Sequence, residues 1–336
     1  MKYIITIDAG TTNTRAYLWD GGRKLIARAG AEVGVHDTAA AGNNAKLKSA
    51  VRGCLEELLH LGGIGYSDVE GILASGMITS NMGLYELPHV PAPAGAKELA
   101  GGSRKVLLED VCPVPIRFLP GVKNALGEIT AENFETMDMM RGEEVETLAI
   151  LDAYPRGTAY LLVLPGSHTK FVATDEQGRI TGCLTTITGE LLDCITNHTV
   201  IADAVGRRFV SEDGYCREMV LRGFDTGKAA GLARGAFAAR ILNQFGEMDK
   251  EKIANFLLGV ALSGDVQSLR GSQALKLSPE TRVIVSGKNP LRRAIADVLE
   301  RDGFFCRVEE YTPANGLPLS GLGSFRVLDA LCPDYP

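Results

Sequence analysis

Residues 3–29 read YIITIDAGTTNTRAYLWDGGRKLIARA, and residues 159–184 read AYLLVLPGSHTKFVATDEQGRITGCL. Each stretch predicts an apolar strand, a short polar loop, a second apolar strand, a glycine turn and a third strand. When the loops are aligned, Gly10 corresponds to Gly166, whereas Asp8 corresponds to Leu164. The repetition predicts two similar hairpin loops that hold one polyphosphate. Because only the first copy carries a carboxylate, we expect a metal on that side alone.

Composition restricts the classes of protein to consider. The chain has 336 residues, of which 45% are hydrophobic and 23% charged, so it is long enough for two domains with substantial cores. A net charge of −6 argues against nucleic acid or an acidic membrane as the main partner. The seven cysteines form no CxxC pair, which favours reduced thiols. Without a long apolar run or a leader pattern, we expect a soluble cytoplasmic protein.

The regions around the two hairpins predict a mixed α/β architecture. Apolar spacing predicts helices over residues 46–61, 142–151, 229–245, 250–263 and 290–302, and strands over residues 71–75, 115–119, 282–286 and 304–308. A Met-rich helix is expected after Lys123. We therefore predict two duplicated domains, residues 1–120 and 121–336, with a final helix from about residue 319 that crosses back. The long loop after residue 76 is either a surface excursion bounded by prolines or a substrate-binding segment.

The first hairpin loop has the chemistry that a phosphate site requires. Asp8 ends a buried strand, and Gly10 permits close approach of the backbone. Thr11, Thr12 and Asn13 add hydroxyl and amide donors beside backbone N–H groups. The alternative is an ordinary turn whose polar side chains satisfy their own backbone. The repetition of this pattern in the second hairpin favours phosphate binding.

The second hairpin loop contains Gly166, Ser167, His168 and Lys170. The last two residues add a hydrogen-bonding or cationic group beside a transferred phosphoryl group. Taken singly, such a His is more often structural and such a Lys is more often solvated. No GxxxxGK[ST] motif is present, so the chain lacks a Walker loop.

Two further segments provide candidates for catalysis and for nucleoside binding. Glu143 and Glu144 follow Arg141-Gly142 at a predicted helix start, where a carboxylate can serve as a general base for a sugar hydroxyl. Carboxylates in a first helical turn also complement the helix dipole, which is the simpler explanation. Ser286-Gly287 ends a strand and offers bare backbone to a nucleoside, although the Asn289-Pro290 that follows it is also ordinary helix-start chemistry.

The duplicated hairpin with DxGTT resembles the actin, hexokinase and heat-shock chaperone superfamily of ribonuclease H-like ATPases. Six blocks in order, DAGTTNTRA, SGMI…PHVPAPA, LPGVK, MRGEE, LPGSHTK and TGEL, resemble the 2-dehydro-3-deoxygalactonokinases over about residues 3–325. The sequence departs from that family at Ala9, where Trp is usual, and in the loop Thr79–Tyr85. The resemblance implies two domains around an active-site cleft and ATP-dependent phosphorylation of the 6-hydroxyl of 2-dehydro-3-deoxy-D-galactonate in D-galactonate catabolism.

The resemblance also implies roles for individual residues. Asp8 would hold Mg²⁺, the two hairpin loops would hold the phosphates of ATP, and Glu143 would be the base, with Glu144 as the alternative. The substrate carboxylate needs a donor, for which Arg141, Lys170 and the loop at residues 77–86 are unranked candidates. The complete set of expected contacts is Gly10, Thr11, Thr12, Asn13, Gly166, Ser167, His168, Ser286 and Gly287 for nucleotide, and Met77, Asn81, Glu86, Arg141 and Lys170 for sugar acid. Alternatives are a kinase for another sugar acid, a phosphatase or a non-catalytic nucleotide switch, and homodimerisation is left open.

Overall fold

The computed structural model describes residues 2–246 and 248–331. The first part of the chain forms β1 (Tyr3–Ala9), β2 (Thr14–Trp19), β3 (Leu25–Ala31), α1 (Val35–Ala41), α2 (Ala45–Gly62), β4 (Val69–Gly76), β5 (Val90–Pro91), α3 (Ala96–Gly102), β6 (Arg104–Val106), β7 (Ile116–Phe118), β8 (Val122–Lys123), β9 (Met139–Met140) and α4 (Glu143–Leu151). The second part forms β10 (Tyr160–Leu164), β11 (Thr169–Thr174), β12 (Ile180–Thr186), α5 (Thr188–His198), α6 (Arg217–Phe245), α7 (Lys250–Gly271), β13 (Arg282–Ser286), α8 (Leu291–Asp302), β14 (Val308–Tyr311) and α9 (Leu319–Leu331).

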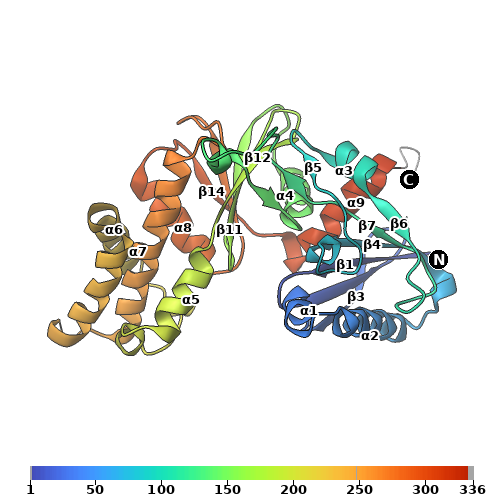
Figure 1. Cartoon of the computed structure of the whole chain (residues 1–336), viewed down its shortest axis with the longest axis horizontal. Helices are drawn as coiled ribbons and strands as arrows, with labels where there is room; N and C mark the ends of the chain where they lie inside the picture. The colour runs from blue at the N-terminus through green and yellow to red at the C-terminus, as the bar shows by residue number, and fades with distance from the viewer. Residues whose placement is uncertain (1, 247, 332–336) are drawn as a thin grey trace.

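Two mixed sheets with one shared topology dominate the molecule (Figure 1). The first sheet has the order β3-β2-β1-β4-β7-β6, and the second has the order β12-β11-β10-β13-β14. In each sheet an antiparallel three-stranded meander is followed by a parallel neighbour of its first strand. The structure therefore confirms the predicted pair of duplicated ribonuclease H-like units. The exact domain limits remain a prediction.

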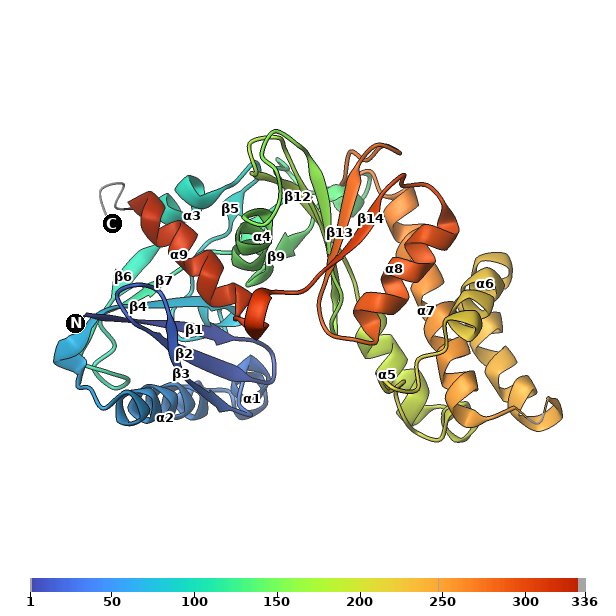
Figure 2. The ribbon, with the colours of Figure 1, turned by 180° about the vertical axis from the view of Figure 1, so that it is seen from behind.

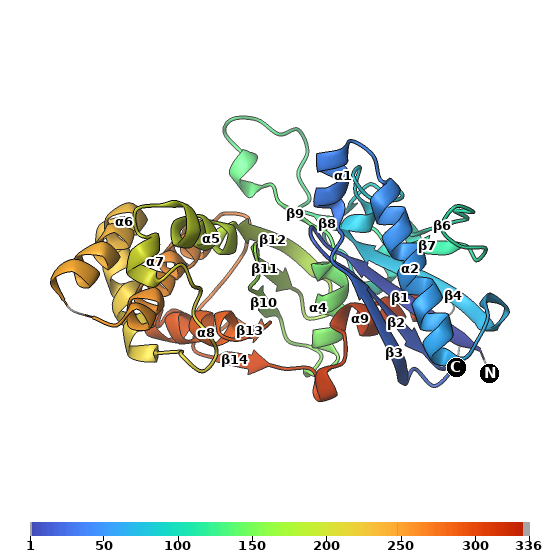
Figure 3. The ribbon, with the colours of Figure 1, turned by 90° about the horizontal axis from the view of Figure 1, so that it is seen from below.

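Three hydrophobic cores alternate with the two sheets. Side chains on successive strand residues point to opposite faces, so each central strand contributes to two cores. Ile5 and Ile7 of β1 pack toward α2, and Leu161 and Val163 of β10 pack toward the helical layer of α5 to α8. The opposite faces of both sheets meet in a third core with α4 and α9 (Figures 2 and 3). This central core joins the two halves.

The last helix returns to the first half of the chain. In Figure 2, α9 lies across the first sheet beside α4, and it contacts β1 as well as α4. Gly323 makes the close helix contact possible, because a Cβ there would lie 1.7 Å from the carbonyl oxygen of Val145. In the part of the chain that the structure describes, no helix is both long and apolar enough to span a membrane.

Three local predictions were wrong. No Met-rich helix follows Lys123; the segment instead forms β9, which pairs with β8 in a small sheet with β5. The strand expected at residues 304–308 forms at Val308–Tyr311, because Phe305 is used as a core anchor before the strand begins. Asn289 does not cap α8, since its amide donates to Glu212 Oε1 instead (2.8 Å).

Candidate active site

Equivalent strand ends place both hairpin loops at the same edge of their sheets. Asp8 pairs with Ser75 across β1 and β4. In the second sheet Val163 pairs with Val285, so the next residue along β10 lies beside Ser286. Both parallel neighbours therefore end in the same dipeptide, Ser75-Gly76 and Ser286-Gly287. The register supports the alignment of Asp8 with the residue after Val163, and it shows a second repeated motif that sequence reasoning overlooked.

In the first hairpin loop backbone carbonyl groups are hydrogen-bonded, whereas several backbone N–H groups are free in the part of the chain that the structure describes. Gly10 N–H donates to the carbonyl of Asn13 (2.8 Å), which closes the loop. The first turn of α1 bonds the other side, as His36 N–H donates to the carbonyl of Thr11 (2.9 Å). Within the described residues, no acceptor is found for the backbone N–H groups of Thr11, Thr12 and Asn13. Such a set of convergent N–H groups is suited to phosphate oxygens.

The second loop repeats this arrangement with the start of α5. The N–H of Glu190 donates to the carbonyl of Ser167 (3.1 Å), and His168 Nε2 lies 3.0 Å from Glu190 Oε1. The structure as described shows no acceptor for the N–H groups of Gly166, Ser167 and His168. Each half therefore offers a loop with three free donors, supported by a helix N-terminus.

A cavity of about 920 Å³ lies between the two loops. It brings together several of the predicted residues, namely Thr11, Glu143, Gly166, Ser167, His168, Ser286 and Gly287. Asp8, Gly10, Thr12 and Asn13 belong to the same hairpin as Thr11 without lining the cavity. Arg15 and Glu146 also line it and were not expected from the sequence.

At the start of α4, the two candidate bases Glu143 and Glu144 lie in different environments. Gly142 has φ 111°, a conformation that favours glycine, and it turns the chain into the helix. Both carboxylate oxygens of Glu144 accept from the N–H of Gly142 (2.9 and 2.8 Å), and this side chain is fully buried. Glu143 lines the cavity instead, and its Oε2 atom has no hydrogen-bond partner among the described residues. Of these two carboxylates, only Glu143 faces the cavity.

Three carboxylates influence one another beside the first loop. Burial raises the pKa of Glu146 to about 8, with further contributions from Asp8 and Glu143. Burial also raises the pKa values of Asp8 and Glu143, which Arg15 and Lys170 respectively oppose. Glu146 lies three residues after Glu143, which places both on one helix face, and this spacing could have identified it from sequence. The three carboxyl groups of Asp8, Glu143 and Glu146 therefore interact with one another beside the first hairpin loop.

The predicted sugar-acid residues lie outside the 920 Å³ cavity. Arg141 donates to Thr79 Oγ1 (2.8 Å) and to the carbonyl of Leu87 (2.6 Å), and thereby holds the long loop after β4. Lys170 Nζ donates to the carbonyl of Met139 (2.8 Å). The remaining three candidates differ in exposure: Asn81 and Glu86 are exposed, and Met77 packs partly against the first core.

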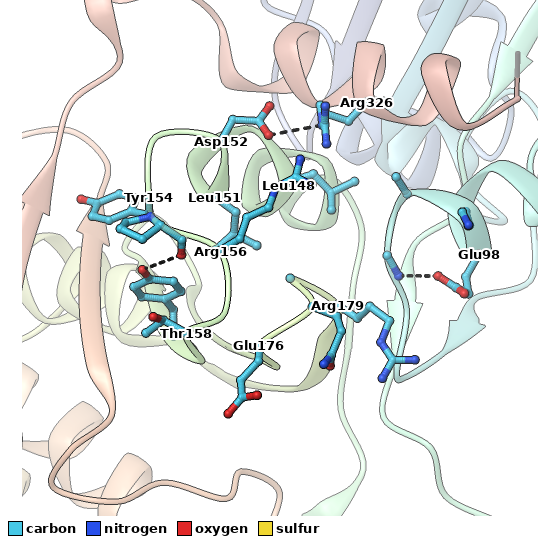
Figure 4. Close-up of a pocket in the computed structure, with 17 residues that line it drawn as sticks. Glu98, Leu148, Leu151, Asp152, Tyr154, Arg156, Thr158, Glu176, Arg179 and Arg326 are labelled. Carbon is cyan, nitrogen blue, oxygen red and sulfur yellow. Dashed lines mark hydrogen bonds and ion pairs between the residues drawn. The ribbon is translucent and has the colours of Figure 1, made fainter. Parts of the chain in front are cut away.

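A second hollow, of about 360 Å³, lies near the other end of α4 (Figure 4). Its walls are joined by an ion pair between Asp152 and Arg326 (3.3 Å) and by a hydrogen bond from Tyr160 to the carbonyl of Pro155 (3.0 Å). Neither hairpin loop nor Glu143 reaches it. The ion pair fastens the end of α4 to α9, and the hydrogen bond ties β10 to the loop that precedes it.

The duplicated sheets, the facing donor loops and the carboxylate between them define a phosphotransferase of the actin and hexokinase-like ATPase fold. More narrowly, the chain belongs to the 2-keto-3-deoxy-galactonokinase family, which it matches over residues 8–321. It is therefore a kinase that acts on an alcohol group.

Individual relatives agree with this assignment. The chain is 27% identical to the 2-dehydro-3-deoxygalactonokinase of Escherichia coli K12 over 266 residues, which cover 79% of this chain and 80% of that protein. It is 29% identical over 204 residues to a Rhizobium meliloti protein assigned the same activity, covering 60% of this chain and 59% of the relative. A crystal structure of a Sinorhizobium meliloti protein with this assignment superposes with a TM-score of 0.73 at 22% identity, covering 98% and 99% of the two chains. That similarity supports the fold.

Proposed function

We propose that this protein transfers the γ-phosphoryl group of ATP to the 6-hydroxyl of 2-dehydro-3-deoxy-D-galactonate, a step of D-galactonate catabolism. The observation that carries the proposal is the unpartnered Oε2 of Glu143 in a cavity between two loops of free backbone donors. Family membership supports the substrate class. The 27% identity with the Escherichia coli enzyme supports the particular sugar acid.

Both hairpin loops would bind the phosphates. The backbone N–H groups of Thr11, Thr12 and Asn13, together with those of Gly166 and Ser167, offer donors from opposite sides of the cavity. The preorganised donors stabilise charge on the phosphoryl oxygens without having to reorient. Gly287 leaves bare backbone at the end of β13, so the nucleoside would lie along Ser286-Gly287.

Glu143 would act as the general base. It accepts the proton of the 6-hydroxyl while that oxygen bonds to the γ-phosphorus, and the bond from phosphorus to the bridging oxygen of ADP breaks. Burial raises the pKa of Glu143 from the ordinary range of a carboxyl group, which brings its proton affinity closer to that needed near neutral pH. Glu144 would support this role from behind by fixing Gly142.

The carboxylates beside the first loop fit a hydrated Mg²⁺. Oxygen ligands suit this ion, which usually keeps several waters and takes only one or two protein carboxylates together with substrate phosphates. Asp8 would hold it, with Glu146 nearby, and the ion would supply charge neutralisation at the phosphates. In residues 2–246 and 248–331 no cluster of three or more metal-binding side chains exists.

Replacing Glu143 by Gln tests the assignment. The variant should bind ATP like the parent and lose about 10²–10⁴-fold in turnover, because the amide cannot accept the proton. The measurement is sugar-acid-dependent ADP release in a coupled assay, with binding of a non-hydrolysable ATP analogue followed separately. Glu57→Gln, on the exposed side of α2, serves as the matched control.

The same assay separates the competing functions. Unchanged turnover in Glu143→Gln would refute the role of this residue. Phosphate release without any sugar acid would indicate a hydrolase, and nucleotide binding without turnover would indicate a switch. A panel of 2-keto-3-deoxy sugar acids that includes the gluconate epimer decides which acid is preferred.

A further inference from the structure

One face of the small sheet β5-β8-β9 carries a group of cationic and imidazole side chains that form no ion pair with any carboxylate among the described residues. We call His89, Lys123 and Arg141 the cationic face. We propose that the cationic face binds the carboxylate of the substrate, with Lys123 and His89 as the contacting residues and Arg141 as the residue that positions them. This inference rests on the proposed function, because it assumes a sugar-acid substrate.

Strand register puts these residues together. Val90 pairs with Val122, and Val122 pairs with Met140, so these three side chains share the face that packs into the central core. Because side chains alternate along a strand, the neighbouring positions fall on the opposite face. Lys123 lies there, together with residues 89 and 141 at the adjoining ends of β5 and β9.

Gly121 brings His89 and Arg141 into contact. A Cβ at position 121 would lie 2.7 Å from Arg141 Cγ and 2.9 Å from His89 Cδ2, so both side chains cross the bare backbone. Arg141 Nη2 is 3.4 Å from His89 Nδ1. The geometry fixes the imidazole beside the guanidinium and leaves its other edge available.

The positive charge of this face lacks a counterion. Arg141 uses its N–H groups on the neutral oxygens of Thr79 and Leu87, with no carboxylate within ion-pair distance in the described part of the chain. The side chain of Lys123 has no hydrogen bond or ion pair to any described residue. Unpaired cations that are partly withdrawn from water are costly unless a ligand supplies the opposite charge.

The titration of His89 supports this description. The pKa of His89 is lowered to about 4, first by burial and then, in decreasing order, by the charges of Arg141, Lys123 and Lys170. Two carboxylates act on Arg141 in return, Glu144 and Glu86. Glu144 is bonded to the N–H of Gly142, and Glu86 is exposed. A bound carboxylate would therefore meet little competition from acidic groups of the protein.

The cationic face is joined to the proposed base through Lys170. The ammonium of Lys170 donates to the carbonyl of Met139, the partner of Lys123 in β9, and its charge also lowers the pKa of Glu143. Arg141 precedes Glu143 by two residues. A six-carbon acid with its carboxylate on the cationic face would direct its far end toward Glu143, which is where the 6-hydroxyl must lie.

Lys123→Met tests the proposal, because it keeps most of the side-chain volume and removes the charge. We expect kcat/KM for 2-dehydro-3-deoxygalactonate to fall about 10- to 100-fold, mainly through KM, as lost charge-assisted hydrogen bonds cost about that much. The carboxamide of the same substrate should react equally with parent and variant. Lys123→Arg should recover much of the loss, and Lys105→Met, on the exposed edge strand β6, should behave like the parent.

Calorimetric binding of the sugar acid gives a second measurement. Since a bound carboxylate raises the pKa of His89, binding at pH 5.5 should be accompanied by net proton uptake, and His89→Gln should reduce this uptake. Equal losses on acid and carboxamide, or no loss on either, would overturn the inference while the kinase assignment stands. If the parent phosphorylates no sugar acid at all, both the proposed function and this inference fail.

Discussion

The two hairpin loops share one backbone plan but lie among different charges. Each follows a central strand, exposes three backbone donors and bonds its carbonyls to the start of a helix. The first copy carries Asp8 and faces Glu143 and Glu146, whereas the second has Leu164 at the position of Asp8 and continues into Lys170. Under the proposed function, duplication would have supplied the phosphate-binding loop twice, and substitution at single positions would have made one copy suited to a cation.

The hydrogen bonds that hold the two hairpin loops in place also differ. The side chain of Thr14 bonds the carbonyl of Val33 behind the first loop (2.8 Å). Behind the second loop, the buried carboxylate of Asp265 accepts hydrogen bonds from Thr169 (3.3 Å) and Thr188. The second loop is thus fixed by a carboxylate from α7, in the helical layer of the second half. The two loops therefore differ in the hydrogen bonds that hold them as well as in the charges around them.

Asp8→Asn gives the largest expected effect on this comparison. Loss of the carboxylate should lower activity at physiological Mg²⁺ by about 100-fold or more, since a metal clamp on phosphoryl oxygens contributes several kcal/mol. Activity should rise with Mg²⁺ concentration over a range where the parent is saturated. Steady-state kinetics across a Mg²⁺ titration provides the measurement.

A substitution at the equivalent position of the second hairpin serves as the control for Asp8→Asn. Leu164→Met conserves volume in the core and should leave the Mg²⁺ dependence of the parent unchanged. The asymmetry is refuted if Asp8→Asn keeps the parental Mg²⁺ response. It is equally refuted if Leu164→Met alters that response.

Gly34→Ala and Gly189→Ala test what the two copies share. A Cβ at Gly34 would lie 2.3 Å from the carbonyl oxygen of Thr11, and one at Gly189 would lie 2.2 Å from that of Gly166. Either substitution must displace a loop, and displacements near 1 Å cost up to about 100-fold in rate. We expect both variants to lose about 10- to 100-fold in kcat/KM for ATP.

Gly53→Ala is the matched control for these two substitutions, because a Cβ at this position in α2 meets nothing within 4 Å. It should retain full activity and gain up to about 1 kcal/mol in stability from its better helix propensity. A variant at Gly34 or Gly189 with parental kinetics would show that the corresponding loop does not hold phosphate.

The repetition was visible in the sequence because apolar strands and turn residues are local signals. The two hairpins, the main helices and the two loops could be predicted from it, whereas the order of the strands in the two sheets comes from the structure. The second repeat, Ser75-Gly76 and Ser286-Gly287, was not noticed, because its relation to the hairpins depends on parallel pairing between distant strands. The segment after Lys123 that contains β9 was predicted to be a helix, since a two-residue strand has too little pattern to predict.

The site was predicted less completely than the fold. Glu143 and Glu144 were indistinguishable as adjacent carboxylates, and only the hydrogen bonds of Glu144 to Gly142 separate them in space. His89 was missed, since its neighbours Lys123 and Arg141 arrive from two other strands. Glu146, by contrast, was within reach of sequence reasoning, because residues three apart on a helix share a face.

Glu146→Gln gives the smallest expected effect. It should change the thermal stability of the protein and leave phosphate binding by the backbone N–H groups of the two loops unchanged. The pKa of Glu146 is raised to about 8 in the folded protein, so this carboxyl keeps its proton where the unfolded chain, with an ordinary pKa of 4.5, has lost it. The folded state therefore binds more protons than the unfolded state between these two pH values. The contribution of Glu146 to the free energy of unfolding is complete below about pH 4.5 and falls as pH rises toward 8. Gln cannot lose a proton, so the variant should melt about 3–6 °C higher than the parent at pH 8 and similarly at pH 4.5, without Mg²⁺. Thermal melts across this range, with Glu57→Gln as control, measure the difference. Parallel curves for parent and Glu146→Gln would mean that the first hairpin does not face a desolvated carboxyl group, and the charge difference between the two copies would then reduce to Asp8 alone.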